Sequence, residues 1–145
     1  MSTRANIIIK EGNEKLFFYR HSDGYPEGTM PTLNIFLKWV KEHKIRDNVN
    51  QASGWLIIIG ALEYGTIPHC EFKESGYPGG KAYAKKETIE APADWKASAY
   101  EPTTGIHGDI EYLYIIDLDA KEIKCYEDWT DDGEGKKEVE LAAKY

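Results

Sequence analysis

The chain has 145 residues, of which 41% are hydrophobic and 30% are charged, and its formal net charge at pH 7 is −7. This length suits one domain with a sizeable core, and the negative charge argues against general binding to nucleic-acid backbones, whose phosphates require clustered Lys and Arg. The charge is uneven, since residues 1–46 carry eight Lys or Arg against five acidic residues, so this third of the chain could still bind a small anion.

Two apolar runs near the amino terminus predict a β-hairpin. Residues 5–10 read ANIIIK, residues 16–20 read LFFYR, and the polar stretch EGNEK between them contains a glycine. The period of two gives the second strand two faces, with Leu16, Phe18 and Arg20 on one and Phe17, Tyr19 and His21 on the other. Both faces become polar at the end, so we expect the strand to leave the core at Arg20 and His21.

Two helices are predicted in the middle of the chain. The first begins at Pro31 or Thr32, and its apolar side chains recur at helical spacing: Leu33, Phe36, Leu37 and Val40. The second covers about residues 50–64, where the helical positions are Trp55, Ile58, Ile59 and Leu62. A buried strand is the alternative that this apolar run leaves open.

The second half of the chain predicts a short strand within TIPHCEFK, a long excursion over residues 74–97, and a second hairpin. In that hairpin, the strand of residues 109–118 pairs with residues 122–127. Residues 128–145 are predicted to form an acidic, flexible tail after a single domain of residues 1–127. Strands at both ends and helices between them indicate an α+β fold, an antiparallel sheet of the two hairpins with both helices packed on one face.

The turn after the first hairpin is the first candidate ligand-binding site. Five side chains are close together in the sequence there: Tyr19, Arg20, His21, Asp23 and Tyr25. An Arg guanidinium binds phosphates or carboxylates, a His transfers protons near neutral pH, and a nearby Asp can fix the tautomer of the His. The structural alternative is that Asp23 only makes a turn, Tyr25 stacks on the next proline, and Arg20 pairs with an acidic residue of the other hairpin.

A second group of candidate residues lies near the start of the strand of residues 109–118. His107, Asp109 and Glu111 would share one strand face if the strand began early, with ~6.6 Å between neighbours along the strand. A metal or a substrate could bridge two of them, and a metal would need His21 or His69 to complete its ligands. Such a row is also typical of the solvated edge of a half-buried strand.

Several familiar motifs are missing or incomplete. SGYPGGKA lacks the first glycine and the Ser or Thr of a phosphate-binding P-loop, and no G-x-S-x-G or H-E-x-x-H pattern occurs. Cys70 and Cys125 form no C-x-x-C pair, which favours two free thiols in a reducing compartment over a zinc site, with a disulfide or a reactive thiol as the alternatives. We therefore predict no cofactor and no bound metal.

No targeting segment or membrane span is predicted. The first apolar run is too short for a signal peptide, and no apolar stretch reaches the ~20 residues that cross a bilayer. We therefore expect a cytoplasmic protein with no membrane partner.

Three segments of the chain, STRANIIIKEG, YRHSDGYPEG and HGDIEYLYIIDL, resemble those of uncharacterised small proteins in phages, prophages and other bacterial mobile elements. The resemblance covers the two hairpins and the first turn, and it implies a setting, the bacterial host cell, but no activity. Small phage accessory proteins often block or sequester a host component, sometimes a defence enzyme or its nucleotide signal.

These observations support three hypotheses of function. The leading one is an accessory protein without enzymatic activity that binds a small anion, such as a signalling nucleotide, at residues 19–28, or that inhibits a host defence protein through its acidic surface. The alternative is a small metal-assisted hydrolase or nuclease-like enzyme that uses His21, His107, Asp109 and Glu111. The third is a homo-oligomer held together by the aromatic strand faces.

Overall fold

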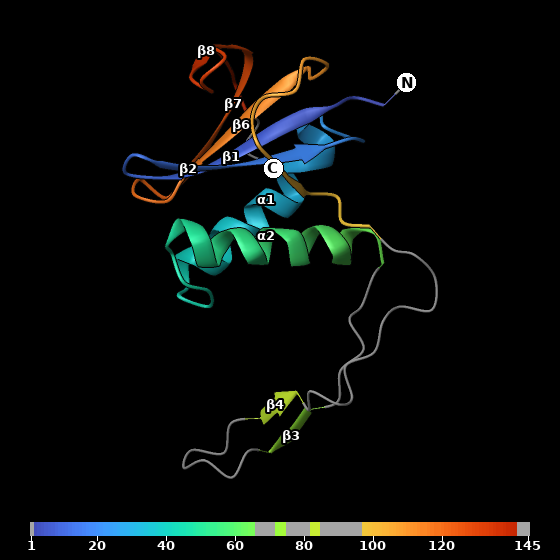
Figure 1. Cartoon of the computed structure of the whole chain (residues 1–145), viewed down its shortest axis with the longest axis vertical. Coiled ribbons are helices and arrows are strands. Elements are labelled where there is room, and N and C mark those ends of the chain that lie inside the picture. Colours follow the sequence, from blue (N-terminus) through green and yellow to red (C-terminus); the bar gives the residue numbers. More distant parts are fainter. Residues whose placement is uncertain (1, 66–71, 75–81, 85–96, 142–145) are drawn as a thin grey trace.

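The computed structural model describes residues 2–65, 72–74, 82–84 and 97–141 (Figure 1). In chain order, its elements are β1 Ala5–Glu11, β2 Glu14–Arg20, α1 Pro26–Lys41, α2 Val49–Glu63, β3 Phe72–Glu74, β4 Ala82–Ala84, β5 Glu101–Thr103, β6 Tyr112–Asp117, β7 Glu122–Trp129 and β8 Gly135–Val139. Within this part of the chain, neither helix has the length and apolar character needed to cross a membrane.

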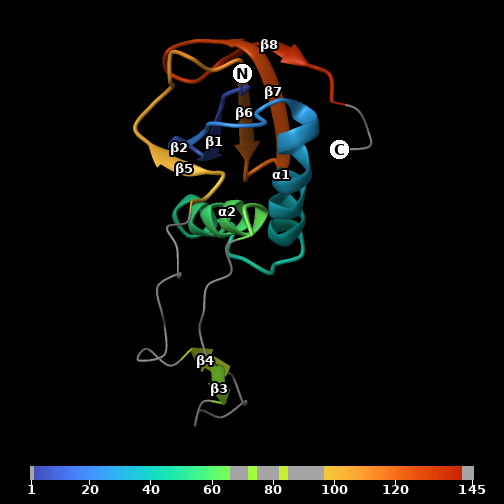
Figure 2. The ribbon, with the colours of Figure 1, turned by 90° about the vertical axis from the view of Figure 1, so that its right-hand side faces the viewer.

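Six strands form one sheet, and both helices lie on the same side of it (Figures 1 and 2). The strand order is β5-β2-β1-β6-β7-β8, whereas β3 and β4 pair only with each other in a second small sheet. The α+β class and the antiparallel pairs β1–β2 and β6–β7 agree with the sequence predictions. Helix α2 also forms close to its predicted range, so the alternative of a buried strand there is wrong.

The prediction of a purely antiparallel sheet is wrong at one place, because β1 and β6 run parallel. Ala5 pairs with Tyr112, so β6 begins at the same end of the sheet as β1. The loop of residues 104–111 causes this, since it returns the chain to that end before β6 starts. Asn6 holds the loop in place, because its Oδ1 accepts a hydrogen bond from the backbone N–H of His107 at 2.8 Å.

Helix α1 begins at Pro26 and not near Pro31, where the sequence pattern had predicted its start. The first turn of a helix leaves its backbone N–H groups without partners, so a proline costs nothing there, and Pro26 fits this position. The preceding turn is tied to the helix by Thr29, whose hydroxyl donates to the carbonyl oxygen of Asp23 at 2.9 Å.

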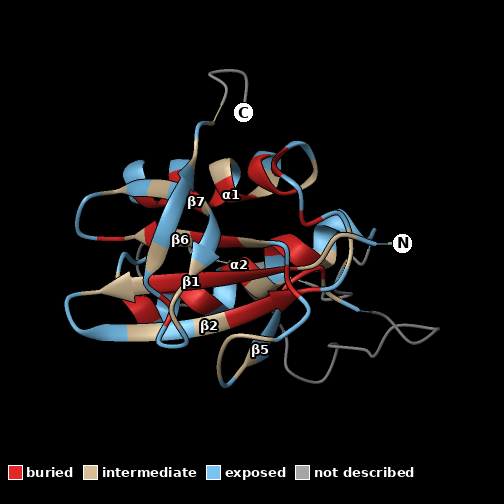
Figure 3. Cartoon of the chain, turned by 90° about the horizontal axis from the view of Figure 1, so that it is seen from above, coloured by how far each residue is buried: buried red, intermediate tan, exposed pale blue. Residues whose placement is uncertain are grey.

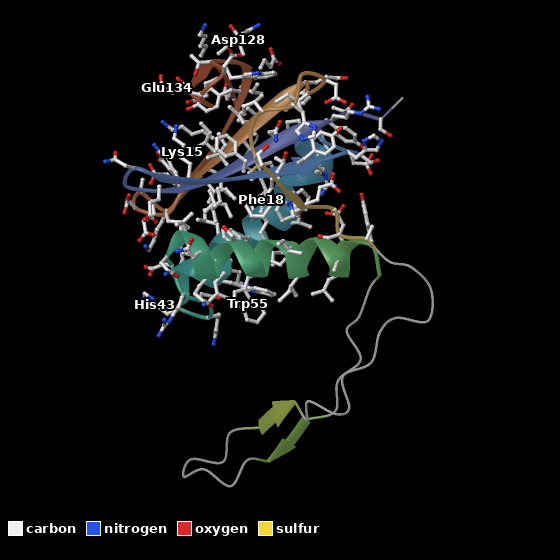
Figure 4. The ribbon with its side chains drawn as sticks, viewed as in Figure 1. Lys15, Phe18, His43, Trp55, Asp128 and Glu134 are labelled. Atoms are coloured by element: carbon white, nitrogen blue, oxygen red, sulfur yellow. The ribbon has the colours of Figure 1, made fainter. Side chains whose placement is uncertain are left out.

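The two faces of the sheet differ in what covers them. The face toward the helices forms most of the core, which contains Ile7, Ile9, Phe18, Tyr114 and Ile116 from the sheet and Leu33, Phe36 and Leu56 from the helices. Figure 3 shows this burial along the centre of the sheet and on the inner sides of the helices. In Figure 4, Phe18 lies between the sheet and α2, whereas Lys15 extends from the opposite face, which we call the open face.

The turn between β7 and β8 covers part of the open face. Gly133 in this turn has a φ of 88°, and a Cβ atom on it would lie 2.5 Å from Ile8 Cδ1, so only glycine fits there. Strand β8 falls within residues 128–145, which we predicted to be a flexible tail, and its pairing with β7 orders Gly135–Val139 instead. The charged sequence of β8 suited a tail, but charged residues are also typical of edge strands.

Cys125 of β7 is a free cysteine with 0% exposure, as expected for a buried thiol. Its burial is the main cause that raises the pKa of the thiol to about 12. Because the thiolate is the reactive form of cysteine, Cys125 is chemically inert in the folded protein. Cys70 lies outside the described residues.

Candidate functional site

Four polar side chains meet at one end of the open face, around the hydroxyl of Tyr19. Tyr19 Oη lies 3.2 Å from His21 Nδ1 and 3.3 Å from Asp109 Oδ2. Arg4 Nε lies 3.2 Å from the same Asp109 oxygen and 3.4 Å from His21 Nδ1. The four side chains therefore form a closed ring, in which each contacts two others.

His107 adds a second imidazole to this group. Its ring stacks on Tyr19, with 3.9 Å between the ring centroids and 12° between the planes. Its Nε2 lies 2.9 Å from Thr103 Oγ1, which fixes the orientation of the ring. We call the set of Arg4, Tyr19, His21, His107 and Asp109 the Tyr19 cluster.

Three segments of the chain build the Tyr19 cluster. Tyr19 and His21 are two residues apart at the end of β2 and so lie on the same face, as the strand period predicted. Arg4 immediately precedes β1. His107 and Asp109 come from the loop of residues 104–111, because β6 begins only at Tyr112 and the predicted early start of the strand at Asp109 is wrong.

The hydrogen bonds of the cluster have a preferred direction. Burial, followed by the neighbouring charge of Asp109, raises the pKa of the Tyr19 hydroxyl, so this group stays protonated at neutral pH. It can then donate to Asp109, whereas the Nδ1 of His21 accepts from Arg4 Nε. The cluster is also open to solvent, since the side chains of Arg4 and Asp109 are 32% and 51% exposed and His21 is exposed.

Arg20 lies on the other face of β2 and does not belong to the Tyr19 cluster. It is 1% exposed, and its Nη1 and Nη2 donate to the two carboxylate oxygens of Glu63 at 2.9 and 2.6 Å. Further bonds run from Nη2 to Gly28 O and from Nε to Asp23 O, and the guanidinium lies 5.1 Å from the ring centroid of Tyr100. The expectation that the strand leaves the core at Arg20 is therefore wrong, and the acidic partner comes from α2.

The remaining predicted site residues lie elsewhere around the turn and the loop. The hydroxyl of Tyr25 donates to Asp23 Oδ1 at 3.3 Å, and the charge of Asp23 is the main cause that raises the pKa of Tyr25. Glu111 donates its backbone N–H to Arg4 O at 2.9 Å, and its side chain is exposed. Asp23 and Tyr25 thus shape the turn, and Glu111 positions the backbone of Arg4.

Sequence reasoning missed Arg4 and Thr103. The sequence could have revealed Arg4, because the hairpin pairs Ala5 with Arg20. One more step in this register places Arg4 opposite His21. Thr103 had none, since the strand that carries it is three residues long and pairs with β2 far from it in the sequence.

Two further predictions concern metals and phosphate loops. His69 and most of SGYPGGKA lie outside the described residues. Among the residues that the structure does describe, no three His, Cys, Asp or Glu side chains are placed to hold a metal ion together.

The chain matches no protein-family model, no curated protein and no solved structure. Its function must therefore be inferred from the geometry and chemistry of its own residues.

Proposed function

We propose that the protein is a phage or mobile-element accessory protein that acts by binding a small anionic ligand, such as a signalling nucleotide, at the Tyr19 cluster. One observation carries this proposal: at a solvent-open end of the sheet, the Arg4 guanidinium contacts both the His21 imidazole and the one carboxylate of the cluster, Asp109. Guanidinium and protonated imidazole groups form strong, charge-assisted hydrogen bonds with phosphate and carboxylate oxygens. Sequestering a host signal in this way would fit the setting that the sequence resemblance implies.

The ligand would approach the cluster from the solvent side of Arg4 and His21. Both side chains are accessible, and Asp109 holds the Nε of Arg4 so that the rest of the guanidinium fork can bind a ligand. His107, which stacks on the buried ring of Tyr19, is half-buried and offers its outer ring face beside this position. The site therefore supplies both a charged partner for an anion and one ring face for a flat group.

Substitutions at Arg4 and His21 test this proposal. Each of Arg4→Gln and His21→Gln is expected to weaken the binding of inorganic phosphate about tenfold, because the first removes a guanidinium and the second an imidazole that would donate to the anion. Binding is measured at low salt from the NMR ring signals of His107, and native mass spectrometry of gently purified protein identifies any ligand already bound.

The matched controls are Arg46→Gln and His43→Asn, which change exposed residues in the connection between α1 and α2 (His43 in Figure 4). Both controls should leave the phosphate affinity unchanged. If the Arg4 and His21 variants bound phosphate as tightly as the controls do, the ligand site would not be the Tyr19 cluster.

A hydrolase or nuclease-like enzyme is the second candidate, and the contacts of the Tyr19 hydroxyl with His21 and Asp109 favour it. A hydroxyl between an imidazole and a carboxylate could relay a proton to or from a reacting group. Tyr19→Phe would break this relay while keeping the stacking on His107, so phosphodiester hydrolysis should fall about 100-fold if this candidate is right. Wild-type protein that hydrolyses no phosphodiester, with or without added divalent metal, would exclude it.

A further inference from the structure

A groove lies at the other end of the open face, between the β1–β2 hairpin and the turn that joins β7 to β8. Its volume is about 560 Å³, and the residues that line it include Ile8, Lys10, Lys15, Ile115, Tyr126 and Glu134. Figure 4 shows Lys15 on the hairpin and Glu134 on the turn above it. We call this the lysine groove, and its volume is within the range of small-molecule sites.

Two lysines of the groove face each other across neighbouring strands. Lys10 pairs with Lys15 in the antiparallel register, and like charges directly opposite each other destabilise a strand pair. Neither ammonium group is tightly held, because Lys10 Nζ lies 3.6 Å from Asp117 Oδ2 and Lys15 Nζ lies 3.4 Å from Asp132 O. An anion placed between the two ammonium groups would replace this repulsion with attraction.

The carboxylate of Asp117 keeps other hydrogen-bond partners if Lys10 turns from it to a ligand. Its Oδ1 accepts hydrogen bonds from the backbone N–H groups of Asp119 and Ala120 at 3.0 and 3.1 Å. Burial alone would raise the pKa of Asp117, but these bonds and the charge of Lys10 together hold it below its ordinary value. The turn therefore keeps a charged carboxylate that does not depend on Lys10 alone.

The floor and one wall of the groove are apolar and fixed. Ile115 is half-buried at the floor, Ile8 is fully buried beneath it, and Tyr126 packs directly under Gly135, where an added Cβ would collide with the ring. Thr130 holds the turn, since its Oγ1 accepts from Glu134 N at 3.0 Å and its own N–H donates to Glu134 O at 2.8 Å. The groove is thus formed before any ligand arrives, which lowers the entropy cost of binding.

We propose that the lysine groove binds a phosphate monoester attached to a flat ring, as in a nucleoside monophosphate. The phosphate lies between Lys10 and Lys15, and the ring lies against the half-buried side chains of Ile115 and Tyr126. Glu134 lines the groove, so a longer phosphate chain would meet its negative charge; the adjoining depression of about 130 Å³ contains the carboxylates of Asp117 and Glu122 beside Lys10 and Lys124. The groove is separate from the Tyr19 cluster, so this proposal does not depend on the function proposed above.

The test is a titration of the full ¹⁵N-labelled chain with AMP, adenosine and inorganic phosphate, followed through the backbone amide signals. We expect AMP to shift the signals of Gly12, Asn13 and Gly133 around the groove. AMP should also bind about tenfold more tightly than adenosine or phosphate, because only AMP contacts both the lysines and the apolar floor. ATP should bind more weakly than AMP.

Charge-removing variants complete the test. Lys10→Gln and Lys15→Gln should each weaken AMP binding about tenfold, whereas Lys41→Gln at the end of α1 should have no effect. Both groove variants should fold, because each removes the repulsion between the two lysines. The proposal is overturned if AMP shifts no groove signal, if Lys15→Gln binds AMP like the wild type, or if ATP binds more tightly than AMP.

Discussion

Removing the carboxylate of Glu63, as in Glu63→Ala, is expected to lower the free energy of unfolding by about 3 kcal/mol, because it leaves a charged, unpaired guanidinium in the protein interior. Arg20 is 1% exposed, and an Arg side chain does not lose its proton in proteins, so it cannot adapt by becoming neutral. The expected loss of free energy of unfolding is at the lower end of the range for breaking a buried ion pair. The reason is that the Glu63 side chain is 21% exposed, so water can reach the space that it leaves.

The position of Glu63 in the helix supports the same expectation. Glu63 is the last residue of α2, where the helix dipole disfavours a negative charge. The two hydrogen bonds from Arg20 offset this cost, and they join the end of β2 to the end of α2. The pair therefore fixes the helix against the sheet just beneath the turn that precedes α1.

Urea unfolding of the wild type and of three variants measures this effect. The double variant Arg20→Met and Glu63→Leu should be within about 1 kcal/mol of the wild type, because apolar side chains of similar size can replace a buried ion pair at little cost. Glu122→Ala, an exposed change in β7, is the control and should alter stability by less than about 0.5 kcal/mol. If Glu63→Ala were as stable as this control, Arg20 could not depend on Glu63 for its burial.

Two glycines of α2 are expected to respond in opposite directions to alanine. Gly60→Ala should destabilise the protein by about 2 kcal/mol, because the new Cβ would lie 2.8 Å from the backbone nitrogen of Tyr100 and would collide with Ser98 Oγ. The backbone there cannot easily move away, since the N–H of Ala99 donates to Gly60 O at 3.1 Å. Without such a contact, alanine is the better residue in a helix.

Gly54→Ala provides the matched comparison in the same helix. Apart from its chain neighbours and the backbone of α2 itself, no atom lies within 4 Å of a Cβ built on Gly54, so alanine should stabilise the protein there by about 0.5–1 kcal/mol. Both variants are compared with the wild type by urea unfolding. Stabilisation by Gly60→Ala of the same size would contradict the close contact between α2 and residues 98–100.

Local patterns in the sequence predicted most elements of the fold. The two hairpins and both helices depend on short-range periodicity, which a single sequence displays directly. The parallel pairing of β1 and β6 depends instead on Asn6, whose side chain holds a loop from the far end of the chain. Nothing in the sequence around Asn6 distinguishes it from an ordinary polar residue in a strand. The direction of β6 relative to β1 could therefore not be predicted from the local sequence.

The part of the candidate site that lies on β2 was predictable from strand periodicity, whereas the part that comes from the loop of residues 104–111 was not. The strand period placed Tyr19 and His21 on one face, and both lie in the Tyr19 cluster. The chemistry of His107 and Asp109 marks them as candidates, but they reach Tyr19 through a loop and not through strand alternation. Arg20 was placed on the correct face, yet its burial depends on Glu63, which is remote in the sequence.

The place of β1 in the sheet has a consequence for how the chain is made. β1 lies between β2 and β6, and β6 leaves the ribosome only after both helices. Until then, one edge of β1 lacks its partner, although its three isoleucines Ile7, Ile8 and Ile9 are fully buried in the finished fold. Unpaired apolar edges of this kind favour association between nascent chains. The first hairpin is therefore expected to need protection by chaperones while the two helices are synthesised. The free edge of β1 is covered only when Tyr112 and the following residues of β6 emerge and pair with it.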